Sequence, residues 1–212
     1  MRVFQTIKIY WQKGVSDEQI AFARATIEGI LAFAKARNSI KIELGGQISV
    51  APYKSIFRRR VSIDKLEAKG LEFHRSRDVE SGYDYAFILV KWPIFDTFDK
   101  RKERFLGFAS SFKYAIVSTK FSKNIKPEQR PGKLKWVIFH EVGHLFGLIS
   151  PIRRDELVKV SFVGCRHCHN QNCVMYPYYN NFAEVDFNMP FCAVCLLELR
   201  DNLRDYSSFR SE

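Results

Sequence analysis

Residues 140–150 read HEVGHLFGLIS, and the first eight of them follow the pattern His-Glu-x-x-His-x-x-Gly. In an α-helix, residues four positions apart lie within about 40° of one another, so His140 and His144 project from the same face. Two imidazoles in this arrangement can bind one zinc ion, and Glu141 lies on the neighbouring flank. Zinc lowers the pKa of a bound water towards ~7, and a nearby carboxylate can take its proton, so the stretch indicates a metal hydrolase.

The residues around this motif argue against ordinary core or surface histidines. They are apolar on nearly every side: Trp136, Val137, Ile138, Phe139, Val142, Leu145 and Phe146. An unpaired histidine or glutamate buried among them would be costly, and metal binding removes that cost. A catalytic zinc needs three protein ligands and an open position. Gly147 can adopt a positive φ that lets a further ligand approach, but three places after it the chain has Ser150.

The five cysteines of the chain are crowded into its last quarter, at positions 165, 168, 173, 192 and 195. Cys168-x4-Cys173 and Cys192-x2-Cys195 form two pairs, and four thiolates grouped in this way are typical of a closed structural zinc site. An odd number of cysteines in a chain without an export signal argues against a disulfide framework. Unrelated free thiols are the alternative interpretation, and Cys165 is left over as a bystander.

Together these residues resemble the archaemetzincins, small zinc metalloproteases of the metzincin clan. The family pattern is His-Glu-x-x-His-x-x-Gly-x-x-His-Cys-x4-Cys-x-Met, followed by Cys-x-x-Cys. HEVGHLFG matches the first half, HCHNQNCVM at 167–175 matches the second, and CAVC at 192–195 supplies the last pair. The resemblance covers about 133–200. It departs from the family in one respect, because nineteen residues separate Gly147 from His167 where the family pattern has two.

The resemblance implies two zinc ions, one catalytic and one structural, and no other cofactor. The residues that it assigns to them are His140, His144 and His167 as ligands of the catalytic zinc, Glu141 as the general base that activates the zinc-bound water, and Cys168, Cys173, Cys192 and Cys195 as ligands of the structural zinc. Met175 would be the Met-turn methionine, an apolar floor beneath the three imidazoles.

The insertion at 148–166 is compatible with this site. Each doubling of loop length costs only ~0.6 kcal/mol in closure entropy, so the chain can leave and return to the same position. Cys168, bound next to His167, would anchor its return. We predict that the insertion forms a small flap or hairpin at the rim of the cleft. His169 is the rival third ligand, and whether the insertion blocks or gates the site stays open.

The remainder of the chain predicts an α+β fold. Ser16 and Gln19 form a capping-box pattern ahead of an apolar stripe, so a helix begins there and ends near Asn38. We expect strands at 2–10, 39–44, 84–91 and 113–121, a turn at 127–132, and helices at 133–147 and 190–206. The expected architecture is a metzincin-like single domain over 1–212. Residues 1–147 supply a mixed, twisted sheet packed with two long helices, and residues 148–212 form an irregular C-terminal part with the Met-turn and a last helix.

These features predict a zinc-dependent metallopeptidase that hydrolyses peptide bonds in a peptide or protein substrate. By analogy with the clan, the peptide would lie extended along an edge strand within 105–113. One alternative is a catalytically silent zinc protein of the same fold, although such a protein has no need of Glu141. Another is a zinc ribbon that binds nucleic acid, since the net charge is +11. That alternative leaves His140 and His144 unexplained, so we do not expect a nucleic-acid partner.

The apolar segments are too short for a transmembrane helix, and the N-terminus lacks the pattern of a signal peptide. We therefore expect a cytoplasmic protein without a membrane partner. A monomer is the simplest expectation for the oligomeric state, which the sequence does not reveal. It does not reveal the cleavage specificity either.

Overall fold

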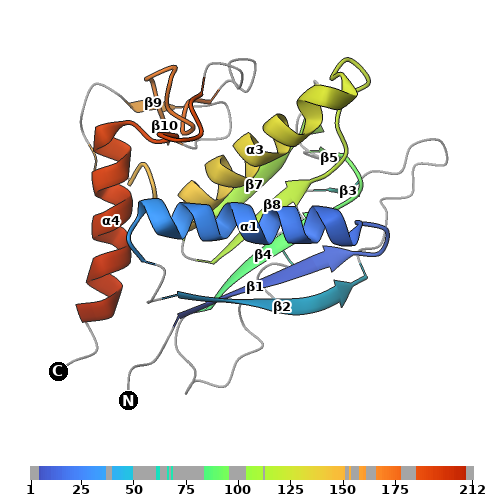
Figure 1. Ribbon diagram of the computed structural model, residues 1–212, viewed down its shortest axis with the longest axis horizontal. Helices are drawn as coiled ribbons and strands as arrows, with labels where there is room; N and C mark the ends of the chain where they lie inside the picture. Colours follow the sequence, from blue (N-terminus) through green and yellow to red (C-terminus); the bar gives the residue numbers. More distant parts are fainter. Residues whose placement is uncertain are drawn as a thin grey trace.

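A sheet of five strands lies at the centre of the computed structural model of the protein, in the order β2-β1-β4-β8-β7 (Figure 1). The residues that the structure describes are 5–36, 40–49, 61–62, 66, 68, 84–95, 104–111, 113–150, 153, 158–160, 166–177 and 185–208. The strands of this sheet are β1 (Gln5–Gln12), β2 (Ile40–Ile48), β4 (Asp84–Val90), β7 (Gly107–Ser110) and β8 (Tyr114–Ser118). Four of them are parallel, and β7 pairs with β8 in the antiparallel direction at one edge. The mixed sheet expected from the sequence is therefore confirmed.

Two smaller sheets accompany the central one. One consists of the short strands β3 (Val61–Ser62), β5 (Ile94–Phe95) and β6 (Arg104–Phe105). The other is an antiparallel pair of β9 (Val158–Val160) and β10 (Arg166–Cys168). This pair confirms that the insertion at 148–166 contributes a strand to a hairpin. The returning strand of that hairpin continues into His167 and Cys168.

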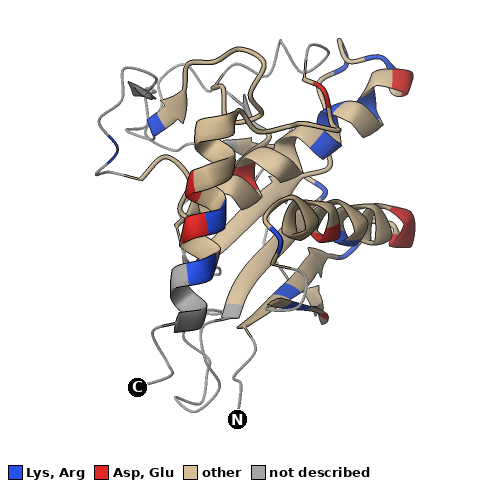
Figure 2. Cartoon of the chain, turned by 60° about the vertical axis from the view of Figure 1, so that its left-hand side comes forward, with Lys and Arg blue, Asp and Glu red and all other residues tan. Residues whose placement is uncertain are grey.

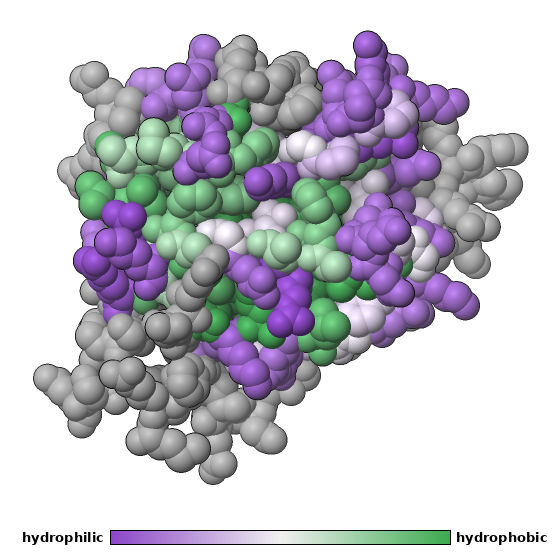
Figure 3. Space-filling view, viewed as in Figure 1, coloured by the Kyte–Doolittle hydropathy of each residue, from purple (hydrophilic) through white to green (hydrophobic). Residues whose placement is uncertain are grey.

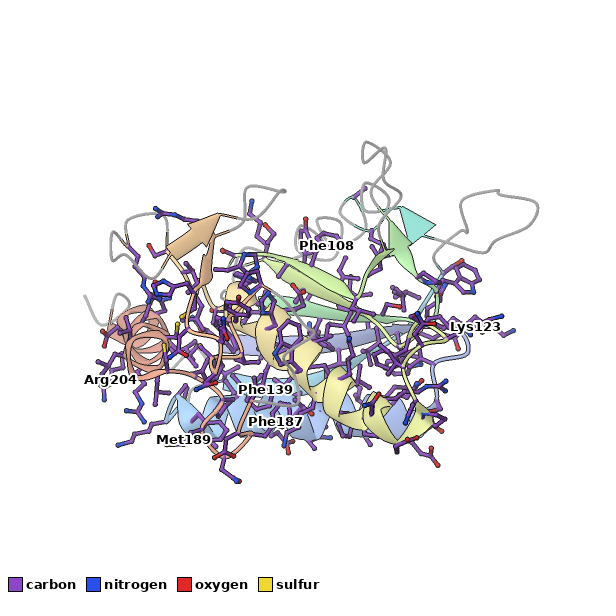
Figure 4. The ribbon with its side chains drawn as sticks, turned by 90° about the horizontal axis from the view of Figure 1, so that it is seen from above. Phe108, Lys123, Phe139, Phe187, Met189 and Arg204 are labelled. Carbon is purple, nitrogen blue, oxygen red and sulfur yellow. The ribbon has the colours of Figure 1, made fainter. Side chains whose placement is uncertain are left out.

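Three α-helices surround the sheet: α1 (Asp17–Phe33), α3 (Arg130–Leu145) and α4 (Ala193–Ser208), with a short 3-10 helix η1 (Pro127–Gln129) before α3. Seen from above, α1 and α3 lie on the same side of the sheet, and α4 lies at one end of the molecule (Figure 4). Within the described ranges, none of these helices is long and apolar enough to cross a membrane. The C-terminal helix expected at 190–206 is observed with slightly later bounds.

The central strands are buried on both faces, and their side chains alternate between two apolar clusters. In β4, Tyr85, Phe87 and Leu89 belong to the cluster under the helices, whereas Ala86 and Ile88 belong to the cluster on the other face. Alternation of this kind follows from the two-residue repeat of a strand. Burial on both faces explains why β4 reads as a continuous apolar run, as parallel strands usually do.

Phe139 of α3 joins the helices to the C-terminal part of the chain (Figure 4). Its ring lies 6.2 Å from that of Phe33 in α1, measured between centroids. The rings of Phe187 and Phe191 lie 6.0 and 5.9 Å from it. Aromatic pairs at these separations attract one another, so Phe139 packs α3 against both α1 and the segment that holds Phe187 and Phe191.

Helix α1 begins as the sequence predicts but ends earlier. The Ser16 side chain accepts a hydrogen bond from the Gln19 N–H, and the Gln19 side chain accepts one from the Ser16 N–H, which completes the capping box. The helix ends at Phe33 rather than near Asn38, which lies outside the described residues. The cause is Lys35, whose φ of 58° is left-handed, while the Ala36 N–H donates to the Leu31 carbonyl.

Helix α3 begins earlier than expected. The segment 127–132, which we expected to be a turn, holds η1 and the first residues of α3. Both prolines of this segment lie at helix starts, where a proline lacks only an N–H that has no partner inside the helix. The prolines thus mark the beginning of the helix and not a separate turn.

Replacing Lys35 by glycine is expected to stabilise the protein. A left-handed conformation costs a residue with a Cβ about 1 kcal/mol relative to glycine. Lys35→Gly should therefore raise the unfolding temperature by about 2–4 °C, measured by circular dichroism. Lys35→Ala, which keeps the Cβ, is the matched control and should not raise it. A lower unfolding temperature for the glycine variant would contradict the assigned end of α1.

Candidate metal centres

Three histidines from two elements meet in one buried group. His140 and His144 come from α3, and His167 comes from β10, more than twenty residues further along the chain. One ring nitrogen of each lies within 4.8 Å of those of the others. The ring centroids are 4.8 Å apart for His140 and His144, and 5.1 and 5.0 Å from these two to His167. Three imidazoles at these separations can hold one metal ion.

Backbone carbonyls set the orientation of the two helical histidines. His140 Nδ1 lies 2.8 Å from the Val174 carbonyl oxygen, and His144 Nδ1 lies 3.3 Å from that of Leu148. A carbonyl oxygen only accepts, so each Nδ1 carries the proton and each Nε2 keeps its lone pair. His144 Nε2 is buried without a hydrogen-bond partner. A metal ligand is the role that fits such a nitrogen, because metal-binding histidines commonly donate their other N–H to a carbonyl.

The environment keeps these imidazoles neutral. Burial, with a smaller contribution from the neighbouring histidines, lowers the pKa of His140 well below its usual range and that of His144 to about 3. The Trp136 ring stacks on His140 with 4.8 Å between centroids. A neutral imidazole is the form that binds a metal, so no proton competes with a cation at neutral pH.

Glu141 lies between α3 and the edge strand β7. Its side chain is only 7% exposed, and burial raises its pKa to about 8. A Cβ on Gly107 would lie 2.6 Å from Glu141 Cγ and 2.9 Å from Glu141 Oε1, closer than real atoms approach. Only glycine at position 107 leaves room for this carboxylate against the backbone of β7.

Met175 is fully buried against α3. A Cβ on Gly143 would lie 2.5 Å from the Met175 sulfur, so the methionine packs directly on the helix between His140 and His144. The Met175 carbonyl accepts a hydrogen bond from the Cys168 N–H, with 3.0 Å between oxygen and nitrogen. The loop that carries Met175 therefore contacts the histidine group on one side and β10 on the other.

Four cysteines form a second group beside the first. The sulfur atoms of Cys168, Cys173, Cys192 and Cys195 all lie within 4.8 Å of one another. The Cys168 and Cys192 sulfurs are 3.8 Å apart, and hydrogen bonds from the neighbouring thiols lower the pKa of Cys192 well below its usual range. Four thiolates this close would repel one another without a cation, and a tetrahedral metal ion is the cation that such a set accommodates.

A buried ion pair holds the start of the insertion against the cysteine group. The Glu198 carboxylate accepts hydrogen bonds from the Ile149 and Ser150 N–H groups at 3.2 and 2.8 Å. Arg153 Nη1 donates to Glu198 Oε2 at 3.0 Å and to the Cys195 sulfur at 3.3 Å. Ile149 has a φ of 61°, which is rare for a β-branched residue and needs support from its surroundings. Glu198 supplies that support.

The structure thus brings together all eight site residues named from the sequence, in the two groups expected, with Glu141 beside the histidines. His169 is exposed and lies outside the histidine group, and Cys165 is outside the described residues. Sequence reasoning missed Arg153 and Glu198. Glu198 follows Cys195 by one helical turn, so both lie on the same face of α4. This spacing could have indicated a buried charge that needs a partner. Metal binding by the two groups stays a prediction.

Removing the Glu198 carboxylate is expected to destabilise the protein strongly. The variant would lose a buried ion pair with Arg153, in which the two side chains are only 8% and 15% exposed, and the hydrogen bonds to the Ile149 and Ser150 N–H groups. Glu198→Ala should lower the free energy of unfolding by about 3 kcal/mol in urea titrations. Asp201→Ala, an exposed site on the same helix, should change it by less than about 0.5 kcal/mol. Equal effects of the two variants would contradict the role given to Glu198.

The overall fold is similar to those of known metalloproteinases. No protein-family model and no curated protein sequence matches the chain. The crystal structure of archaemetzincin from Methanopyrus kandleri aligns with a TM-score of 0.65 at 17% identity, covering 95% of this chain and 97% of that one. Archaemetzincin from Archaeoglobus fulgidus, in complex with malonate, gives 0.58 at 15% identity over 92% and 99%. Metalloproteinase-II from Bacteroides fragilis gives 0.55 at 14% identity over 95% and 53%. The chain therefore has the fold of the archaemetzincins, as its sequence motifs predict.

Proposed function

We propose that this protein is a zinc-dependent metallopeptidase that hydrolyses peptide bonds. The observation that carries the proposal is the convergence of three imidazoles, two of them neutral and oriented by backbone carbonyls, with one carboxylate beside an edge strand. A purely structural metal site has no use for Glu141, because such a site is closed by its own ligands. The similarity of the fold to metalloproteinases agrees with this function.

The proposal assigns the catalytic zinc to His140, His144 and His167. A second, structural zinc is assigned to Cys168, Cys173, Cys192 and Cys195. The catalytic zinc, when bound, supplies a positive charge that polarises the peptide carbonyl and lowers the pKa of water. The nitrogen that His144 leaves without a hydrogen bond and the four adjacent sulfurs are the donors that fit zinc. Met175 serves as the Met-turn floor that keeps the imidazoles in position.

Glu141 moves the proton in this mechanism. Its ionised carboxylate, which a bound zinc ion would favour against the effect of burial, accepts a proton from the attacking water and then delivers it to the leaving amine. At Gly107 the backbone of β7 packs closely against the carboxylate and so restricts its position. The buried surroundings exclude bulk water from the carboxylate, so the transferred proton is not lost to solvent.

The edge strand β7 is the proposed binding site for the substrate backbone. It lies at the end of the strand order and pairs only with β8, within the residues that the structure describes. An extended peptide can add to such an edge through main-chain hydrogen bonds. A peptide placed there runs past Gly107 and therefore past Glu141. This agrees with the edge expected within 105–113, and peptides or proteins are the expected substrates.

Zinc counting tests the assignment of the third ligand. We expect about two zinc ions per wild-type chain and about one in His167→Ala, measured by inductively coupled plasma mass spectrometry. His169→Ala is the matched control, because this exposed histidine lies two residues away, and it should keep about two. If His167→Ala also keeps two zinc ions, His167 is not the third ligand of the zinc that His140 and His144 bind.

Digestion of a peptide library tests catalysis. Glu141→Gln keeps the size of the side chain but cannot accept the proton, so we expect at least a hundredfold lower rate, of the order found for general bases. The variant should retain its zinc, which excludes loss of metal as the cause. Cleavage at equal rates by both proteins would remove Glu141 from the mechanism. Failure of the zinc-loaded wild type to cleave any peptide would favour a catalytically silent zinc protein.

A further inference from the structure

A cavity of about 860 Å³ opens at the opposite end of α3 from the histidines. It lies where the parallel strands β4 and β8 end, between the first turns of α1 and α3. Its lining consists of Glu18, Gln19, Phe22, Lys91, Trp92, Pro93, Thr119, Lys120, Phe121, Lys123, Arg130, Pro131 and Leu134. None of these residues belongs to the histidine or cysteine groups. Ligands of open α/β sheets commonly bind beyond the carboxyl ends of the parallel strands.

The charged residues of this cavity are mainly positive. Four cations, Lys91, Lys120, Lys123 and Arg130, line it together with one carboxylate, that of Glu18. Within the described residues, none of the four cations forms an ion pair with a carboxylate. Figure 3 shows hydrophilic side chains gathered on the right, over the beginnings of α1 and α3, and Figure 2 shows basic residues on the first turns of α3.

The cationic side chains of the lining outnumber its single carboxylate. The first turn of α3 carries no acidic residue, although the beginning of a helix has partial positive charge and favours acidic ones. Four cations against one carboxylate leave the lining with an excess of positive charge, which favours an anionic ligand. A bound anion would offset this excess.

The apolar part of the lining is aromatic. Phe22, Trp92 and Phe121 are each partly buried, and each keeps some surface towards solvent. The Lys91 ammonium lies 5.8 Å from the centroid of the Trp92 ring, so the cationic and aromatic parts of the lining adjoin. Flat rings next to lysine and arginine side chains suit a ligand that combines a planar ring with phosphate. A simple anion would leave the aromatic surfaces unused.

We propose that this cavity binds a nucleoside phosphate. Its base would stack on Trp92 or Phe121, and its phosphates would contact Lys120, Lys123 and Arg130. The volume is within the usual range for small-ligand sites. The proposal is independent of the peptidase function, because it involves neither metal group.

Isothermal titration of the purified full chain with ADP tests the proposal. We expect a Kd of roughly 100 μM or lower for ADP, and binding at least about tenfold weaker for inorganic phosphate and for adenosine. Lys123→Glu/Arg130→Glu should raise the Kd for ADP about tenfold or more. Trp92→Leu should weaken ADP binding but leave phosphate binding unchanged. Circular dichroism verifies that each variant is folded.

Lys113→Glu/Arg204→Glu is the matched control, because it makes the same change in net charge at exposed residues outside the cavity. Figure 4 shows Lys123 and Arg204 at opposite ends of the molecule. The control variant should bind ADP as the wild type does. The proposal is overturned if both charge reversals weaken ADP binding equally, if ADP binds no better than phosphate, or if a hexaglutamate peptide binds more tightly than ADP.

Discussion

One peptide bond in β10 joins the two groups of candidate metal ligands. His167 lies with the histidines of α3, and the next residue, Cys168, lies with the other cysteines. The Cys168 N–H donates to the Met175 carbonyl, which holds this strand against the loop whose Val174 carbonyl contacts His140. Neither group can therefore move without the other. Pairing of β10 with β9 holds the same strand from the side of the insertion.

Close packing around α3 supports this arrangement. Gly143 lets Met175 approach the helix between the two helical histidines, and Gly107 lets Glu141 lie against β7. In both places a methyl group would collide with a side chain, that of Met175 or of Glu141, so these positions need a residue without a Cβ. Phe139, on the opposite side of the helix from the sheet edge, ties α3 to α1 and to the C-terminal segment. The three histidines and Glu141 thus lie on regular elements, α3 and β10.

The insertion enters this framework at a strained but well-supported position. Ile149 adopts a left-handed conformation directly after Leu148, whose carbonyl orients His144. Glu198 binds the backbone of Ile149 and Ser150, and Arg153 connects the same carboxylate to a cysteine sulfur. The backbone at the start of the insertion is therefore held in one position next to the histidine group. This explains how nineteen residues, where the family pattern has two, can be accommodated between Gly147 and His167 without separating the two halves of the motif.

Local geometry allowed the sequence by itself to determine several features. The four-residue spacing of His140 and His144 places them on one helical face, the Ser16 capping box starts α1, and the apolar run of β4 marks a central strand. Only the tertiary structure decided that His167 and not His169 joins the histidines, and that Glu198 binds a backbone 48 residues away. The end of α1 at Phe33 and the start of α3 at Arg130 also differed from expectation. Contacts between distant residues leave no periodic signal in a sequence, because they arise only when separate elements pack together.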